Sequence, residues 1–292
     1  MRRARLAIPT CAGIRAQGSD PLHVTATWRL LIDDGPAEGA WNMALDRAVQ
    51  LACDARHVPP TLRLYSWVRP TVTLGRFQDA AGVDRVLCAE RGIDVVRRFT
   101  GGRGVLHDDE VTYSLVAGLA DEIPKGTAAS YRMLCAGLVE AYRLLGVEAS
   151  LTARPRGSGS SAACYLHATA ADLSLGAMKL SGSAQVWSGE TVLQHGSFVI
   201  SRDVELEARV FRLAETDSRR LAVETATLVG SLGSRPSREQ ILEAVHSGVA
   251  RGLGVCFVRG QVTDEERAHA SRLLAEVSAD RLPARAGVRV SR

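Results

Sequence analysis

Residues 97–108 read Arg-Arg-Phe-Thr-Gly-Gly-Arg-Gly-Val-Leu-His-Asp, and this stretch constrains the fold more than any other. The apolar residues before it predict a strand over 93–98, and the glycines that follow predict a tight loop. Guanidinium groups and exposed backbone N–H groups together form a site that can bind an anion. An ordinary glycine hairpin is the alternative interpretation. The candidate binding residues here are Arg98, Thr100, Gly101, Gly102, Arg103 and His107.

Lys179 is the second informative feature, because the sequence contains almost no lysine. Of its 36 Lys and Arg residues, only Lys125 and Lys179 are lysines. A chain with this bias supplies ordinary surface charge as arginine, so a retained lysine is expected to do what a permanently charged guanidinium cannot. Chance retention in a turn is the alternative, and it fits Lys125. Lys179 opens a segment rich in small residues, in which Gly182, Ser183 and Gln185 are candidate binding residues.

Cys164 is a candidate nucleophile because of its position. The six cysteines show no Cys-x-x-Cys pairs or zinc spacing, so neither disulfides nor a metal site are predicted, and a reducing cytoplasm is expected. Cys164 alone follows a Gly- and Ser-rich loop and precedes Lys179. A strand over 171–175 and a turn at Gly176 would return Lys179 toward Cys164, where an ammonium group stabilises a thiolate. Packing in the core is the alternative role for a lone cysteine.

A third polar cluster interrupts an apolar strand at residues 193–197, Leu-Gln-His-Gly-Ser. Polar side chains in such a strand indicate a binding site, and a buried, hydrogen-bonded histidine is the alternative. His195 and Gly196 are the candidate binding residues.

Groups of strands alternate with helices, which predicts an α+β domain with a mixed or antiparallel central sheet flanked by helices. The segment 62–67 alternates like a half-buried strand and is expected to form a hairpin with 71–75. Gly146 is expected to end a helix over 127–145. Further strands are expected at 28–33, 111–117, 182–187 and 192–200, and further helices at 40–52, 83–91, 237–252 and from 263 onward.

The composition limits the classes of partner. The net charge of +4 comes without clustered basic and aromatic residues, so no nucleic acid is expected, whereas an acidic protein partner would suit it. No apolar run approaches the roughly 20 residues of a membrane span, so no membrane is expected. Residues 1–27 are arginine-rich and are expected to be a disordered extension. The catalytic domain is assigned to 28–235, and the helical residues 236–292 either pack on it or form a small appendage.

The motifs at 97–108, 179–185 and 193–197, in this order, resemble the biotin/lipoate protein ligase superfamily. Its fold is a catalytic domain similar to that of class II synthetases. The segment 41–46 resembles the first helix of that family, and Gly75-Arg76-Phe77-Gln78 resembles its Gly-x-x-Gln turn.

Within the superfamily, Cys164 favours the cysteine-type octanoyltransferases of lipoate synthesis, because the ATP-dependent lipoate ligases need no cysteine. Those transferases carry a Cys-Phe…Glu-Leu…Gly-x-Lys pattern. Here Cys164-Tyr165, Asp172-Leu173 and the segment 176–179 fit it, with Tyr for Phe, Asp for Glu and one extra residue before the lysine. The residues after the cysteine depart from the pattern at Ala168, Thr169 and Ala171.

The resemblance implies transfer of an octanoyl group from acyl carrier protein to a lysine of lipoyl domains, such as glycine cleavage H protein and 2-oxoacid dehydrogenase E2. Cys164 would carry the acyl group as a thioester and Lys179 would assist it. Arg98 and Arg103 would face the phosphopantetheine or the acidic partners. No metal or other cofactor is expected. An ATP-dependent lipoate-protein ligase, with Cys164 incidental, and a non-catalytic lipoyl-domain binder remain the alternatives.

Overall fold

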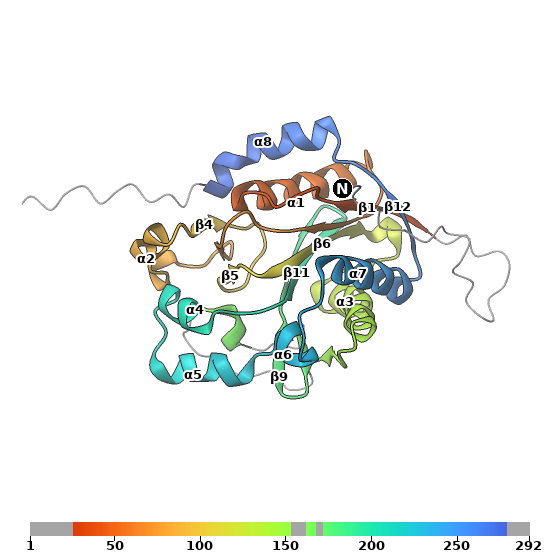
Figure 1. Cartoon of the computed structure of the whole chain (residues 1–292). Helices are drawn as coiled ribbons and strands as arrows, with labels where there is room; N and C mark the ends of the chain where they lie inside the picture. The colour runs from red at the N-terminus through yellow and green to blue at the C-terminus, as the bar shows by residue number, and fades with distance from the viewer. Residues whose placement is uncertain (1–25, 153–161, 168–171, 279–292) are drawn as a thin grey trace, which may run out of the picture.

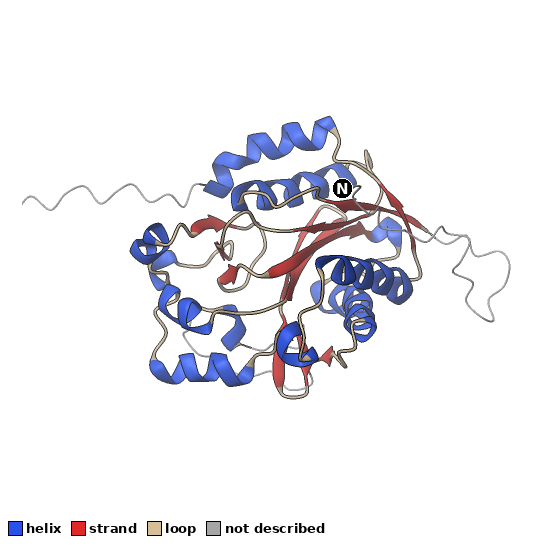
Figure 2. Cartoon of the chain, in the orientation of Figure 1, coloured by secondary structure: helices blue, strands red, loops and turns tan. Residues whose placement is uncertain are grey.

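The computed structural model describes residues 26–152, 162–167 and 172–278. A six-stranded mixed sheet runs through the molecule (Figures 1 and 2) in the order β10-β11-β6-β2-β1-β12. β1 pairs in parallel with β2 and β12, and the other pairings are antiparallel. The predicted α+β class with a mixed central sheet is confirmed. The strands are β1 (Thr27–Ile32), β2 (Thr61–Tyr65), β6 (Glu110–Gly118), β10 (Ser183–Ser188), β11 (Thr191–Val199) and β12 (Cys256–Arg259).

Helices cover both faces of this sheet. α3 (Thr127–Leu144) and α7 (Arg238–Leu253) pack on one face, where they enclose a core with the β1, β2 and β6 side chains. α1 (Gly39–Asp54) and α8 (Asp264–Ser278) cover the other face (Figure 1). The backbones of α3 and α7 approach each other closely at Gly248. A Cβ at this position would lie only 2.3 Å from the backbone nitrogen of Ala141, so the approach requires glycine.

Two small sheets lie beside the central one. The first has the order β4-β3-β5 and packs with the helices that carry residues 85–90, 204–210 and 215–224; the second has the order β7-β8-β9. Their elements are β3 (Thr71–Leu74), β4 (Asp94–Arg97), β5 (Val105–His107), β7 (Ser150–Leu151), β8 (Leu173–Leu175), β9 (Met178–Ser181), α2 (Arg85–Glu90), α4 (Val204–Val210), α5 (Glu215–Glu224) and α6 (Leu228–Leu232), with short 3₁₀ helices at Ala80–Gly82, Leu119–Asp121 and η4 (Cys164–Leu166).

The expected hairpin between 62–67 and 71–75 is wrong. β2 pairs with β1 and β6 in the central sheet, whereas β3 pairs with β4 and β5. β2 is also buried on both faces, because α1 covers the side that carries Arg63. Arg63 donates to Asp33 (2.6 Å) and to Asp46 of α1 (2.8 Å), so its buried charge is compensated.

Residues 236–278 contribute to the central sheet and to the helices on both of its faces. α7 lies on one face, β12 forms an edge of the central sheet, and α8 lies on the other face. The buried Arg29 of β1 donates to Glu266 of α8 at 3.0 Å, which ties that helix to the sheet. Strand β12 was not predicted from the sequence. The expected N-terminal extension lies outside the described residues, apart from its last two.

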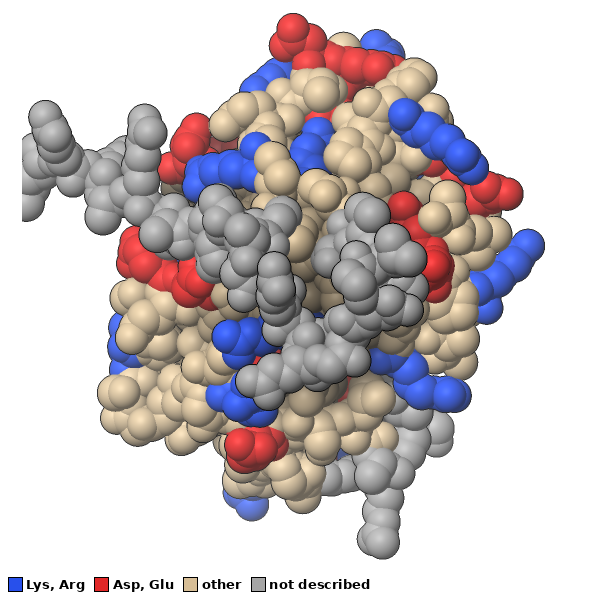
Figure 3. Space-filling model, turned by 90° about the vertical axis from the view of Figure 1, so that its right-hand side faces the viewer, with Lys and Arg blue, Asp and Glu red and all other residues tan. Residues whose placement is uncertain are grey.

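Charged side chains are mixed on the face drawn in Figure 3, which is the right-hand side of Figure 1. Positive and negative groups alternate in its described part, so the net charge of +4 is not gathered there into a basic patch. Among the described residues, no helix combines the length and apolar character needed to cross a membrane.

Candidate active site

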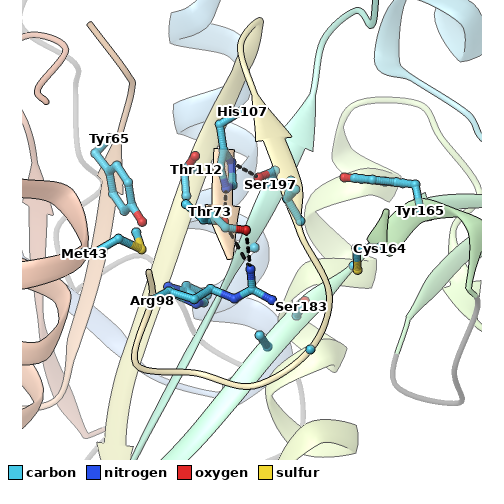
Figure 4. A pocket seen from close by; sticks show the side chains of 16 residues that line it. Met43, Tyr65, Thr73, Arg98, His107, Thr112, Cys164, Tyr165, Ser183 and Ser197 are labelled. Carbon is cyan, nitrogen blue, oxygen red and sulfur yellow. Dashed lines mark hydrogen bonds between the residues drawn. The ribbon is translucent and has the colours of Figure 1, made fainter. Parts of the chain in front are cut away.

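A pocket lies between the central sheet and the β4-β3-β5 sheet (Figure 4). Cys164 and Tyr165 lie at one side of it, and Met43 and Tyr65 lie at the opposite side. All the predicted motifs contribute to its wall. The predicted residues that line it are Arg98, Gly102, His107, Cys164, Gly182, Ser183, His195 and Gly196, whereas Thr100, Gly101, Arg103, Lys179 and Gln185 lie outside the lining.

The Cys164 thiol and the Lys179 ammonium lie together beside this pocket. The β8–β9 hairpin turns at Gly176, whose φ of +57° suits glycine, and returns Lys179 toward the cysteine as expected. Lys179 Nζ lies 3.7 Å from Cys164 Sγ. It also donates to the carbonyl oxygens of Cys164 (3.2 Å) and His167 (2.7 Å) and to Asp172 Oδ2 (3.0 Å). A buried ammonium is thus compensated by a carboxylate and held against the thiol.

Two predicted glycines make room for this pair. A Cβ at Gly182 would lie 3.2 Å from Lys179 Nζ and 3.3 Å from Asp172 Oδ1. A Cβ at Gly196 would lie 2.6 Å from the carbonyl oxygen of Gly182. Side chains at either position would displace the lysine or the backbone beside it, so both glycines serve the geometry of the site.

The glycine loop and the cysteine segment form one unit. The N–H of Gly104 donates to the carbonyl of Ala162 (3.0 Å), and the N–H of Cys164 donates to the carbonyl of Gly104 (2.8 Å). The backbone position of Cys164 is therefore fixed by the glycine loop of residues 101–104.

Arg98 holds this loop from inside. Its guanidinium donates to the carbonyls of Thr73 (2.9 Å), Gly101 (2.7 Å) and Arg103 (2.8 Å) and to the hydroxyl of Thr100 (3.1 Å). Burial lowers the pKa of Arg98 to about 10. Each of its nitrogens donates to the protein's own strand or loop, and Arg98 also lines the pocket. Its expected role toward the phosphopantetheine or the acidic partners stays a prediction. Of the two arginines assigned that role, Arg103 alone is partly exposed.

A buried chain of hydrogen bonds joins Arg98 to helix α1. Thr100 Oγ1 bonds His195 Nε2 (2.7 Å), and His195 Nδ1 bonds Asp46 Oδ2 (3.2 Å). Burial lowers the pKa of His195, against the opposing effect of Asp46. Burial alone would raise the pKa of Asp46, but the hydrogen bond from His195 and the charge of Arg63 hold it below its usual value. Both ring nitrogens of His195 have hydrogen-bond partners, so the ring links the glycine loop to helix α1.

His107 has a similar environment on the other side of the pocket. Its Nδ1 bonds Glu110 (2.7 Å), its Nε2 bonds Thr73 Oγ1 (2.9 Å), and its ring stacks on Trp67 with centroids 4.2 Å apart. Burial would raise the pKa of Glu110, yet His107 and hydrogen bonds from two hydroxyl groups keep it lowered. His107 is therefore fixed in the wall.

Gln185 and Ser183 connect the site to helix α3 and strand β6. Gln185 accepts a hydrogen bond from Ser130 of α3 (3.1 Å) and donates to Gln194 (2.7 Å), while Ser183 Oγ bonds Tyr113 OH (2.6 Å). The predicted Gln185 thus points away from the pocket.

Asp46, Arg63 and Glu110 were not among the candidate residues. The available signal was a charged residue within an apolar segment, as in Leu62-Arg63-Leu64, where alternation instead indicated a solvent-facing arginine. Within the described parts of the chain, no three His, Cys, Asp or Glu side chains are grouped as metal ligands.

Comparisons with known proteins agree with this geometry. The family model of the lipoyl protein ligase A/B catalytic domain matches residues 38–247. The octanoyltransferase LipM of Kyrpidia tusciae is 41% identical over 268 residues, which cover 87% of this chain and 97% of that protein. The octanoyltransferase LipM of Symbiobacterium thermophilum is 38% identical over 260 residues, covering 85% and 94%.

Solved structures show the same fold. A lipoate-protein ligase A bound with ATP superimposes with a TM-score of 0.71 at 22% identity, covering 87% of this chain and 96% of that chain. A bipartite lipoate protein ligase from Thermoplasma acidophilum, described with its E2 lipoyl domain, gives 0.68 at 22% identity, covering 89% and 95%. The chain belongs to the lipoyl protein ligase A/B catalytic domain family. Its relatives of 37–41% identity are named octanoyltransferases, and within the family it is an acyltransferase.

Proposed function

We propose that this acyltransferase moves an octanoyl group from the phosphopantetheine thioester of acyl carrier protein to a lysine of a lipoyl domain, through a thioester on Cys164. The observation that carries the proposal is the contact of 3.7 Å between Lys179 Nζ and Cys164 Sγ at the edge of the pocket. The names of the relatives support the octanoyl group and the transfer reaction.

In the first step, the Cys164 thiolate attacks the carbonyl carbon of the donor thioester. The new bond is Sγ–C, and the bond from that carbon to the pantetheine sulfur breaks. The Lys179 ammonium stabilises the attacking thiolate and then gives a proton to the departing pantetheine sulfur. The acyl chain extends into the pocket toward Met43 and Tyr65.

In the second step, the amine of the acceptor lysine attacks the same carbon. The amide bond forms, the bond to Sγ breaks, and the neutral Lys179 takes the proton that the amine loses. The thiolate and ammonium are thereby restored. Backbone N–H groups around Gly182 and Ser183 stabilise the oxyanion of both tetrahedral intermediates, at about 3 kcal/mol per donor.

The test compares two donors in the presence of an unmodified lipoyl domain. Octanoyl-acyl carrier protein without nucleotide should yield octanoylated domain, and free octanoate or lipoate with ATP should not. The Cys164→Ala variant should lose the reaction, whereas Cys88→Ala should keep it, because burial raises the pKa of the Cys88 thiol to about 11. Product and AMP formed only from the free acid with ATP would replace the transferase by a ligase and make Cys164 incidental.

A further inference from the structure

Phe77 is the most exposed large hydrophobic side chain of the described residues, at 87%. Single exposed apolar residues are common on protein surfaces and need no explanation. Phe77 is different because of how its backbone is held and where the turn that carries it lies.

The turn of residues 75–78 is held by hydrogen bonds from Arg97 and within its own backbone, and two of the three from Arg97 are partly buried. Arg97 Nη1 donates to the carbonyls of Gly75 (2.6 Å), Arg76 (3.2 Å) and Gln78 (2.8 Å). The N–H of Gln78 donates to the carbonyl of Gly75 (3.0 Å). The turn therefore presents the Phe77 ring to solvent from a fixed backbone, and a rigid aromatic contact loses little conformational entropy on binding.

The same turn is attached to the active site. A Cβ at Gly75 would lie 1.9 Å from the carbonyl oxygen of Gly102, so only glycine permits this approach to the glycine loop. The N–H of Arg76 donates to the carbonyl of Thr100 (2.8 Å). Gln78 Nε2 donates to the carbonyl of Ala162 (3.0 Å), two residues before Cys164. A molecule that covers Phe77 thus lies beside the glycine loop and the segment that leads to Cys164.

Arginine side chains lie near the turn that carries Phe77. The exposed Arg76 guanidinium lies 5.3 Å from the centre of the Phe77 ring. Arg47 is a second cation near Arg76. The pKa of Arg47 is lowered mainly by burial and next by the charge of Arg76. Arg97 adds a third cation, since its guanidinium donates to the carbonyls of the turn. The acids near these cations are Asp79, which follows the turn in the sequence, and Asp54 and Glu276, whose charges act on Arg47. An acidic surface with an apolar spot complements this region.

We infer that Phe77 and Arg76 form a docking contact for the acyl acceptor, an acidic protein domain that presents the target lysine; this rests on the proposed function. A lysine stem is only four carbons long. The acceptor must therefore bring its protein surface to the residues beside Cys164, whereas a donor on the much longer phosphopantetheine arm can remain farther away. Buried aromatic and arginine anchors supply much of the affinity of protein interfaces.

The experiment measures the two half-reactions separately in Phe77→Ala, Phe77→Leu and Arg76→Ala. The matched control is Val258→Ala, which removes an exposed side chain (55%) from β12 at the far edge of the sheet. Phe77→Ala should raise the KM for an unmodified lipoyl domain at least tenfold and weaken its binding equally in calorimetry. Phe77→Leu should lose less, and Val258→Ala should match the wild type. Acylation of Cys164 by octanoyl-pantetheine and the melting temperature should not change.

Three outcomes overturn the inference. The first is an unchanged KM and affinity for the lipoyl domain, and the second is a defect confined to the carrier-protein donor, which would make Phe77 a donor contact. A loss of melting temperature in parallel with both half-reactions would also overturn it, since the role would be structural. The binding measurement needs no chemistry. If the wild type binds the domain but forms no acyl-Cys164, the proposed function fails while the docking contact stands.

Discussion

Arg98 and Lys179 are two buried cations beside the same pocket, and they use their hydrogen bonds differently. Arg98 donates only to the strand and loop that it supports, at the carbonyls of Thr73, Gly101 and Arg103. Lys179 donates to two carbonyls and to Asp172 and also contacts the Cys164 thiol. One cation supports the wall of the pocket, and the other contacts the candidate nucleophile.

The difference follows from the two functional groups. A planar guanidinium has several donors in a fixed fork, which suits several carbonyls around one loop. An ammonium is compact and can exchange its proton, which suits the thiolate and leaving-group roles that we propose for the Cys164 thiol. A chain with only two lysines has kept one of them at this position.

The largest expected effect is at Lys179. Both Lys179→Ala and Lys179→Arg should lower kcat by about 10²–10⁴-fold, the range in which positioned proton transfer contributes to catalysis. The fork of arginine cannot fit the space beside Gly182, and it cannot give up a proton. Lys125→Arg is the matched control and should leave the rate unchanged. Wild-type rates in Lys179→Arg would reduce Lys179 to a fixed cation and remove the contrast with Arg98.

Arg98→Lys tests the other half of the comparison. A lysine cannot reach the four groups that Arg98 holds, so buried carbonyls lose their donors, at roughly 2–4 kcal/mol of unfolding free energy. Activity should fall about tenfold, because the loop that positions Cys164 loosens. Urea unfolding measures the stability, and octanoyl-pantetheine acylation measures the activity. Unchanged stability with lost acylation would place Arg98 in the chemistry.

The stability should fall as the pH drops from 7.5 to 5, partly through His195. Burial lowers the folded-state pKa of His195 below its unfolded value of about 6.5. Below that pH the unfolded chain binds a proton that the folded chain does not, so unfolding becomes easier. His195→Gln should reduce the fall, and His246, whose pKa burial also lowers, should account for part of the remainder. A variant with an unchanged pH dependence would show that His195 does not titrate in this range.

The smallest effect concerns the far side of the pocket. Met43 is buried there (3% exposed) opposite Cys164. Met43→Phe should shorten the space for the acyl chain, lowering kcat/KM severalfold for octanoyl-pantetheine and less for hexanoyl-pantetheine. Competition between the two thioesters measures the ratio. An unchanged ratio would place the acyl chain elsewhere.

Local patterns predicted the elements well, and the contact of Cys164 with Lys179 followed from one of them. A strand, a glycine turn and a lysine are close in the chain, so a hairpin was enough to bring Lys179 back. The glycine motifs predicted close packing, which is tight at Gly182 and leaves no room for a Cβ at Gly196.

Pairing between distant segments could not be predicted in this way. The alternation of side chains along a strand is the same whichever strand it pairs with. It therefore could not show that β2 pairs with β6, or that β12, from the other end of the chain, pairs with β1. The hydrogen bonds of Arg98 to its own loop could not be predicted for a related reason. A sequence motif identifies a guanidinium at the site, but only the folded backbone shows that the carbonyls of its own loop occupy it.

We propose that Cys164 carries the acyl group between donor and acceptor. The most direct measurement is intact-protein mass spectrometry of the enzyme mixed with octanoyl-acyl carrier protein without ATP, followed by addition of an unmodified lipoyl domain. We predict one added octanoyl group, mapped to Cys164 by peptide analysis and lost as the lipoyl domain gains it. An enzyme that stays unmodified while the domain becomes octanoylated, or a Cys164→Ala variant with full activity, would contradict the account.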